Sequence, residues 1–424
     1  MIHLKTVGIE EIDFCALVRR GETVMWGQAG AEPVALTSAL MAQRQRIGGF
    51  RAFIGATWSD TAKPEFSDFV HFMSYCGAAG NRALAKAGRL DVLPWHYSQL
   101  GQLIESGRFP VDVVMVQVSQ QESGRYSLSL AHEYLVPALK RARLVIAEIN
   151  ELAPWTYGEY SLGADDIDVA VLTSRVPIEP PRVATTNVEL AVARQVSAFI
   201  EDGSTLQCGI GGLPQSVLQQ LYGHRELGIH TGALLDETAR LIQAGVVTNA
   251  RKRVDPGLSV AGIAMGSAVL SAAVHRNPSV LFRSVGYTHS GKVLADIDRF
   301  VAINSAIEVD LTGQINTEVA QGTYVGAVGG ALDFIRGAHA SKGGIPIVAL
   351  PSTAGADSHR TSRIVGSLSG PVTIPRSDAG LIVTEHGVAD LRGLSLRERA
   401  KCLISVAAPE FRDELQRVAA LASL

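Results

Sequence analysis

Residues 304–337 read NSAIEVDLTGQINTEVAQGTYVGAVGGALDFIRG and contain two adjoining patterns. The stretch begins as an alternating strand, in which apolar side chains stand among polar neighbours, and it runs into a glycine-rich turn. Glycines at such a turn let backbone amides approach a ligand closely. We therefore expect a strand that leads into a ligand-binding turn. The apolar strand positions are Ile303, Ala306, Val309 and Leu311, and the glycines are Gly326, Gly329 and Gly330.

Short apolar runs like this one alternate with helical patterns along the whole chain. Continuous runs rich in Val and Ile suit strands that are covered on both faces, as in α/β sheets. The fold class predicted from these runs is therefore α/β. The runs lie at residues 23–26, 111–118, 144–149 and 169–172 in the first half, and at 204–208, 300–303, 345–350 and 379–384 in the second.

The chain of 424 residues is too long for one ordinary core, so two domains are expected. The segment Val176–Val183 carries three prolines, which suit neither a helix nor an interior strand, and it is the best linker. We place an N-terminal domain at residues 1–180 and a C-terminal domain at 187–424. Near its start each half has a strand, a glycine turn and a helix, which indicates two related α/β domains.

The composition excludes several classes of protein. Hydrophobic residues make up 47% and charged residues 19%, as in a globular protein. A net charge of -3 and the lack of any Lys/Arg block argue against nucleic acid or an anionic membrane as partner. No run approaches the ~18 apolar residues of a membrane helix, and the N-terminus lacks a signal-peptide pattern. The four cysteines are far apart without metal-ligand spacing, so we expect reduced thiols, no metal and a cytoplasmic location.

The sequence GIGGLP, Gly209 to Pro214, has the form of an anion site. Free amides at the first turn of a helix, together with the helix dipole, favour negative charge. In acyl transfer that charge appears on the oxygen of the tetrahedral intermediate. A tight connection between a strand and a helix explains the same spacing equally well. The spacing is neither the dinucleotide fingerprint nor a P-loop.

Ordered motifs along nearly the whole chain resemble the acetyl-CoA hydrolase/transferase family, the class I CoA transferases of the 4-hydroxybutyrate CoA-transferase type. No single motif would suffice, but their number and order indicate membership. The motifs are GQAGAEP (27–33), LPWHYSQL (93–100), VDVVMVQVSQQESGRYSLS (111–129), VIAEIN (145–150), GIGGLP (209–214), LGIHTGALLDE (227–237), AGVVTNARK (244–252), the stretch at 304–337, and VTEHGVADLRGLSLRERAKCLISVAAPEFR (383–412).

The resemblance implies two tandem open α/β/α domains with the active site between them. It also implies a homo-oligomer, dimeric or larger, that acts on acyl-CoA, with coenzyme A lying across the second domain. Turn geometry and strand structure are the alternative explanation for the residues that match positions lining the thioester. Those residues are Gly209, Ile210, Gly211, Gly212, Leu213, Asn304, Gly326, Gly329 and Gly330.

The resemblance also exposes a missing nucleophile. Typical members carry glutamate directly after the His-Thr that matches His230-Thr231, and its carboxylate forms an acyl anhydride and then a glutamyl-CoA thioester. Here that position is Gly232, which has no side chain. A second departure follows the VGG turn, Val328 to Gly330, where Ala331 stands in place of the glutamine of many relatives.

Three explanations compete for this change. Another carboxylate could substitute, with Glu237, Asp236 and Glu32 as candidates. Water could instead attack the thioester, or a carbon–carbon bond beta to it could be cleaved hydrolytically, without a glutamyl intermediate. The protein could also bind CoA compounds without turnover. The first alternative is a true acyl-CoA:carboxylate CoA-transferase, and the last is a binding protein.

Activation of water would need a general base. A histidine with its ordinary pKa near 6.5 suits this task, although each candidate also has a structural explanation. Arg360 and Arg363 could pair with CoA phosphates, since guanidinium binds phosphate bidentately, or could be exposed loop charges. The identity of the acyl group does not follow from the sequence. The base candidates are His96, His230, His289, His359 and Glu32.

Overall fold

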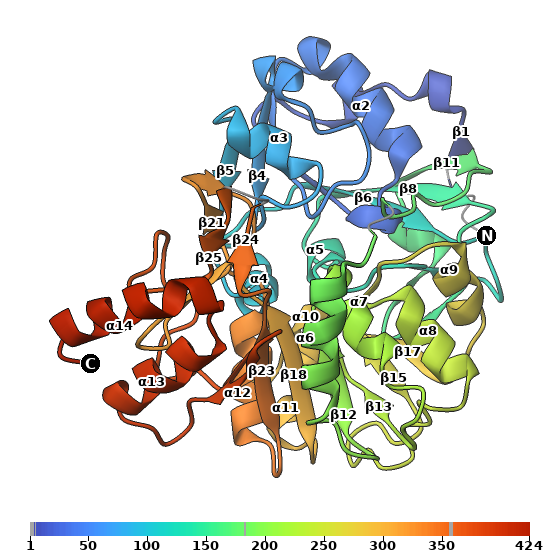
Figure 1. Cartoon of the computed structure of the whole chain (residues 1–424). Coiled ribbons are helices and arrows are strands. Elements are labelled where there is room, and N and C mark those ends of the chain that lie inside the picture. The colour runs from blue at the N-terminus through green and yellow to red at the C-terminus, as the bar shows by residue number, and fades with distance from the viewer. Residues whose placement is uncertain (1–3, 5, 182–183, 356–358) are drawn as a thin grey trace. The chain divides into compact units, whose positions relative to one another are not determined.

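The structure is a computed structural model that describes residue 4 and residues 6–181, 184–355 and 359–424 (Figure 1). The chain forms two compact units. The first unit contains the described residues of Met1–Pro181, Gly232–Ala239 and Leu258–His289, and the second contains those of Arg182–Thr231, Arg240–Gly257 and Ser290–Leu424. The predicted C-terminal domain at 187–424 is therefore not a single compact body. Part of the predicted linker, residues 182–183, lies outside the described residues.

The first unit is built on an eight-stranded sheet whose neighbouring strands are all parallel. Every residue of its inner strands β6 and β8 is buried, which explains why these strands read as continuous Val/Ile runs. The strand order is β1 (Thr6–Val7), β11 (Val169–Thr173), β8 (Leu144–Asn150), β6 (Val113–Val118), β2 (Thr23–Trp26), β3 (Phe50–Phe53), β4 (Val70–Ser74) and β5 (Leu90–Val92).

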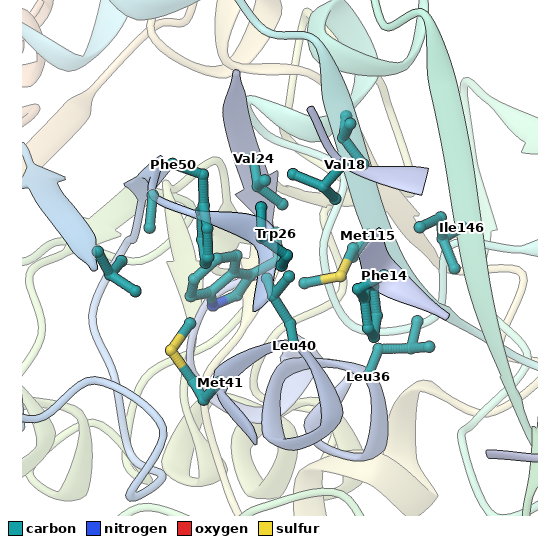
Figure 2. Packing of buried hydrophobic residues seen from close by; sticks show 14 of the residues in the cluster. Phe14, Val18, Val24, Trp26, Leu36, Leu40, Met41, Phe50, Met115 and Ile146 are labelled. Carbon is teal, nitrogen blue, oxygen red and sulfur yellow. The ribbon is translucent and has the colours of Figure 1, made fainter. Parts of the chain in front are cut away.

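Helix α2 (Val34–Ile47) covers one face of this sheet and closes its main core. Figure 2 shows Leu36, Leu40 and Met41 of the helix turned toward Trp26, Met115 and Phe14. The helix ends at Gly48, whose left-handed φ of 80° suits a glycine C-cap. Other helices of the first unit are α1 (Phe14–Leu17), α3 (Asn81–Lys86), α4 (Tyr97–Glu105), α5 (Leu135–Leu139), α9 (Ala268–Val274) and α10 (Val285–Thr288).

The segments that join the first unit from the second half of the chain add short strands. Strand β14 (Ala233–Leu234) pairs in parallel with β16 (Ile263–Ala264). Strands β15 (Ser259–Ala261), β17 (Val280–Phe282) and β9 (Tyr157–Gly158) form a separate parallel sheet. These strands of two or three residues carry too little periodicity to be predicted from sequence.

The second unit has a six-stranded sheet with the order β13 (Gly228–Ile229), β12 (Thr205–Cys208), β18 (Phe300–Ser305), β23 (Ile345–Ala349), β27 (Leu381–Thr384) and β28 (Gly387–Asp390). Only the last pair is antiparallel. Helix α12 (Ala331–Ala340) packs against β18 and β23, while α6 (Asn187–Ser197) packs against β27 (Figure 1). Further helices are α7 (Gly212–Gln219), α11 (Gly291–Ala295), α13 (Leu396–Val406) and α14 (Arg412–Leu421), and α8 (Asp236–Gln243) crosses the boundary between the units.

The expected elements are confirmed with small corrections. Each predicted strand region contains a strand. Helix α13 begins with a capping box formed by Ser395 and Glu398. Helix α7 begins at Gly212, two residues before Pro214, and Pro409 begins a short 3₁₀ turn ahead of α14. The strand predicted at the start of residues 304–337 is broken, because β18 ends at Ser305 and β19 (Glu308–Asp310) belongs to another sheet. No helix among the described residues is long and apolar enough to cross a membrane.

We expect Leu36→Ala to lower the free energy of unfolding by about 2–5 kcal/mol, because it leaves a cavity under the sheet of the first unit. Leu36 is fully buried in the cluster with Phe14 and Met115. Ser38→Ala, at an exposed position of the same helix, should change stability by less than about 0.5 kcal/mol. Urea unfolding of both variants measures this, and equal losses would contradict the packing of α2.

Candidate active site

In both sheets the order in which strands are added reverses at the first long strand. In the first unit the chain leaves β2 for β3 on one side and later places β6 on the other; in the second it leaves β12 for β13 and later adds β18. Ligands of open α/β sheets bind at such a switch point, outside the carboxyl ends of the strands. The candidate ligand sites are therefore the end of β2 beside β6, and the end of β12 beside β18.

The switch point of the second unit gathers several of the predicted residues. The Gly209 amide donates to the Ile303 carbonyl over 2.8 Å, and Asn304 lies at the end of the same neighbouring strand. The Asn304 side chain exchanges hydrogen bonds with Gln207 at 3.0 and 3.3 Å, so this buried amide is already engaged. Ile210 is exposed, Leu213 is buried, and Gly211 takes a φ of 126° at the N-cap of α7.

His230 and Thr231 run beside this turn. The His230 amide donates to the Leu206 carbonyl over 3.1 Å, and its fully buried ring meets Phe300 edge-on, with centroids 6.5 Å apart. The Thr231 hydroxyl donates to the Cys208 carbonyl over 3.3 Å. The residue that precedes Gly232 is thus tied to the strand end that opens the GIGGLP turn.

The VGG turn is shaped by backbone requirements. A Cβ on Gly326 would lie 1.8 Å from the Thr317 carbonyl oxygen, and Gly329 has a φ of 55°. Gly330 is the N-cap of α12. Turn geometry therefore accounts for the first two of these glycines, and a role in ligand binding is not needed to explain them.

The arginines of the polar loop have partners. Arg360 is exposed, forms an ion pair with Glu410 at 3.3 Å and donates to the Thr353 hydroxyl. Arg363 is directed to the backbone carbonyls of Ala306 and Ile307. Arg363 thus holds the loop after β18, while Arg360 lies at the surface. His359, beside it, is exposed.

Glu32 lies past the end of β2 and is fully enclosed by donors. The hydroxyls of Thr37, Ser59 and Thr61 all donate to its carboxylate at 2.5–2.9 Å. Burial raises the pKa of Glu32, and these hydroxyls oppose that rise. A carboxylate held by three hydroxyls is suited to fixing the start of α2, which makes it a less available base.

A second buried carboxyl, that of Glu133, lies in a polar network near the same strand end. The Gln28 side-chain amide donates to one Glu133 oxygen over 2.7 Å, and the Tyr97 hydroxyl donates to the other over 2.6 Å. The Tyr75 hydroxyl and the Ala56 amide donate to the Gln28 carbonyl oxygen at 2.8 and 2.7 Å. Burial raises the pKa of Glu133 to about 7.

Burial keeps two histidines near this network, His132 and His289, neutral at neutral pH. The His289 ring lies 5.1 Å from the Tyr97 ring, and burial lowers its pKa to about 3. His132 stacks on Phe282, and burial likewise lowers its pKa to about 3. His96 is the N-cap of α4 and precedes Tyr97.

Gly232 is half-buried and is held by its carbonyl oxygen, which accepts from the Gly262 and Ile263 amides at 3.0 and 3.1 Å. The Gly262 carbonyl in turn accepts from the His132 amide over 2.9 Å. In the first unit, then, Gly232 is joined through Gly262 to the segment that carries Glu133.

Burial makes the Cys76 and Cys208 thiols less reactive. Cys76 and Cys208 are buried, and burial raises the pKa of both, that of Cys208 to about 12. Within the part of the chain that the structure describes, no group of three or more His, Cys, Asp or Glu side chains is placed to hold a metal ion.

Sequence reasoning missed Gln28, Tyr75, Tyr97 and Glu133 as members of one cluster. Gln28 and Tyr97 lie inside the motifs at 27–33 and 93–100, and Glu133 follows the motif at 111–129 by four residues. The motifs thus marked the neighbourhood, but nothing in them paired these side chains.

Family models for the N-terminal and C-terminal domains of acetyl-CoA hydrolase/transferase match residues 5–185 and 266–419. The chain belongs to the acetyl-CoA hydrolase/transferase family. It is 37% identical over 400 residues to the 4-hydroxybutyrate coenzyme A transferase of Clostridium kluyveri, covering 92% of each protein.

Two solved structures extend this relationship. RipA from Yersinia pestis superimposes with a TM-score of 0.93 at 33% identity, over 99% of this chain and 98% of RipA. The 4-hydroxybutyrate CoA-transferase from Porphyromonas gingivalis gives a TM-score of 0.81 at 31% identity, over 99% and 98% of the two chains. The predicted family and the α/β CoA-transferase fold are confirmed.

We expect the stability of the protein to fall with rising pH because of Glu133. Its pKa is raised from 4.5 to about 7, so the stability of the protonated form is fully present below 4.5 and is lost as pH rises through about 7. At 1.36 kcal/mol per pKa unit the loss is roughly 3 kcal/mol.

Glu133→Gln, which stays neutral, should lack this loss. Urea unfolding of both proteins at about pH 5 and about pH 8 measures the difference. Parallel pH dependence of the two proteins would contradict a buried carboxyl with a raised pKa.

Proposed function

We propose that this member of the acetyl-CoA hydrolase/transferase family acts on acyl-CoA thioesters through direct attack of water, by thioester or carbon–carbon hydrolysis, without a glutamyl-CoA intermediate. The observation that carries the proposal is the glycine at position 232, where the family resemblance implies the nucleophilic glutamate. A glycine can form neither the anhydride nor the glutamyl thioester.

Two of the carboxylates proposed as replacement nucleophiles, those of Asp236 and Glu32, already accept hydrogen bonds in the structure. Asp236 accepts from the amides of Ser267 and Leu270 at 2.9 and 3.2 Å and so holds the start of α9. Glu32 is held by three hydroxyls. Glu237 is buried on α8. Recruiting Asp236 or Glu32 as nucleophile would require breaking these contacts, which favours water.

In this proposal coenzyme A is bound by the second unit. The GIGGLP turn at the β12/β18 switch point supplies backbone amides for the developing oxyanion, as expected at the start of a helix. The VGG turn and Asn304 contribute to the thioester site, and Arg360 would exchange Glu410 for a CoA phosphate. These assignments rest on the family resemblance and on the position of the turn at the carboxyl end of β12.

A true CoA-transferase that uses a displaced carboxylate is the second candidate. It is favoured by the relatives, since those from C. kluyveri and P. gingivalis are both named 4-hydroxybutyrate CoA transferases. The two candidates differ in their dependence on an acceptor: transfer requires a second carboxylic acid, whereas hydrolysis requires only water.

We expect Gly232→Glu to gain the transferase intermediate. Incubation with acetyl-CoA, butyryl-CoA or 4-hydroxybutyryl-CoA should give a borohydride-sensitive glutamyl-CoA adduct by mass spectrometry, and carboxylate exchange should rise by about tenfold or more. Gly232→Gln, of similar size but without a carboxylate, is the matched control and should form no adduct.

The natural protein should release CoA without an adduct and without dependence on an acceptor acid. An adduct or carboxylate exchange in the natural protein would overturn the water mechanism, and peptide mapping of the adduct would identify the displaced carboxylate. If the natural protein binds these thioesters without product, it is a CoA-binding protein.

A further inference from the structure

The Glu133 carboxyl, like that of Glu32, is buried in the first unit and accepts hydrogen bonds from neutral side chains. Its residue is only 2% exposed, and no ion pair to it occurs among the described residues. Glu148, by contrast, is fully buried beside Arg175 at 2.5 Å. A buried carboxyl without a cation is costly to ionise, and such groups are concentrated at functional sites.

The side chains around Glu133 hold it in one orientation. Each of its oxygens accepts one hydrogen bond, from Gln28 and from Tyr97. Gln28 also donates to the Tyr97 hydroxyl over 3.1 Å, which closes the triangle. A Cβ on Gly55 would lie 2.3 Å from the Gln28 side-chain oxygen, so the glycine there leaves room for this arrangement. The half-buried Tyr75 brings the network toward solvent.

The network lies where a ligand is expected. Gln28 follows β2 by two residues, at the switch point between β2 and β6. Open α/β sheets bind ligands outside the carboxyl ends of strands at such a point. Three hydroxyls hold the Glu32 carboxylate near this end of the sheet, and Arg175 pairs with the Glu148 carboxylate.

Glu133 is also close to the position of the missing nucleophile. A Cβ built on Gly262 would lie 3.1 Å from the Gly232 carbonyl oxygen and 3.5 Å from Glu133 Cβ. A side chain at position 262 would therefore contact both the Gly232 backbone and the Glu133 side chain near its Cβ.

We propose that Glu133 is the general base that activates water for attack on the thioester at position 232. This role rests on the proposed function, because a glutamyl intermediate at position 232 would leave no such water in the first step. Gln28 and Tyr97 are positioning residues that aim the carboxylate.

The proposed step is balanced within the site. The water oxygen forms a bond to the thioester carbonyl carbon while one water proton passes to a Glu133 oxygen, and the carbonyl π electrons move to the oxyanion. Collapse of the tetrahedral intermediate breaks the C–S bond. Glu133 returns the proton to the departing thiolate, which gives CoA and the free acid, so no co-reactant besides water is needed.

Three tyrosines and two histidines around Glu133 have pKa values that burial moves away from neutrality. Tyr75, Tyr97 and Tyr134 have pKa values raised well above 10 by burial. His132 and His289 have pKa values lowered to about 3. An acid limb near pH 7 that Glu133→Gln abolishes would therefore be assigned to Glu133.

The decisive experiment measures hydrolysis of acetyl-CoA, butyryl-CoA and 4-hydroxybutyryl-CoA by the natural protein and by Glu133→Gln. We expect kcat to fall by about 100-fold or more, with KM changed by less than about threefold, since loss of a general base typically costs 10²–10⁴ in rate. The rise of kcat/KM through about pH 7 should disappear in the variant.

Two further variants separate chemistry from folding. Tyr97→Phe removes a hydrogen bond that favours the ionised carboxylate, so the acid limb should move to higher pH, which a merely structural role would not cause. Glu308→Gln is the matched control, because Glu308 is also buried and held by the neutral donors Asn316 and Ser369. Its kcat should stay within about threefold of the natural value.

The outcomes also distinguish this inference from the proposed function. If the natural protein hydrolyses a thioester and Glu133→Gln retains kcat within about threefold, the base is another group and the proposal is overturned. If the natural protein hydrolyses none of the three thioesters, or forms an adduct, the proposed function fails and the role of Glu133 fails with it.

Discussion

Parallel strands that are covered on both faces leave their carboxyl ends as the natural place for chemistry. Both sheets here start with a long strand whose successors leave it on opposite sides, so the ends of β2 and β12 are not covered by the crossovers that follow. In the second unit the uncovered end presents backbone amides in a glycine turn. In the first it presents the Gln28 side chain, which reaches the buried Glu133. One topological constraint thus produces a site rich in backbone donors in one unit and a site rich in titratable groups in the other.

The long strands could be predicted because strands that are buried on both faces have nearly continuous apolar sequences. The runs at 113–118 and 144–150 are almost wholly apolar, and no other element gives that pattern at that length. The membership of Gly232–Ala239 and Leu258–His289 in the first unit could not be predicted, because their strands of two or three residues pair with partners distant in sequence. Their register is set by tertiary contacts, which local patterns do not record.

The candidate site was predictable to a similar degree. The glycine turn, and the glycine at the position where the family resemblance implies a glutamate, can be read from residues 209–214 and 232. The structure places Gly209 beside the end of β18, which carries Asn304, and His230 directly follows β13. Glu133 could not be identified from sequence, because the side chains that donate hydrogen bonds to it are distant in sequence, at positions 28 and 97. Its raised pKa depends on burial without a cationic partner, which local sequence does not show. Glu32 lies in a prominent motif, and the sequence did not indicate that three hydroxyls hold its carboxylate.

In the proposed mechanism this fold acts on thioesters without a glutamate at position 232. A glutamate at position 232 must be ionised to attack, and a base that takes a proton from water must instead hold a pKa near the working pH. Burial without a cation gives Glu133 such a pKa, whereas an arginine partner would have lowered it and made the carboxylate a weaker base. The free energy of unfolding is therefore lower above neutral pH, since the ionised Glu133 carboxylate is poorly solvated. A network of Gln28 and two tyrosines is a compromise between these demands, because neutral donors orient the carboxylate without neutralising its basicity.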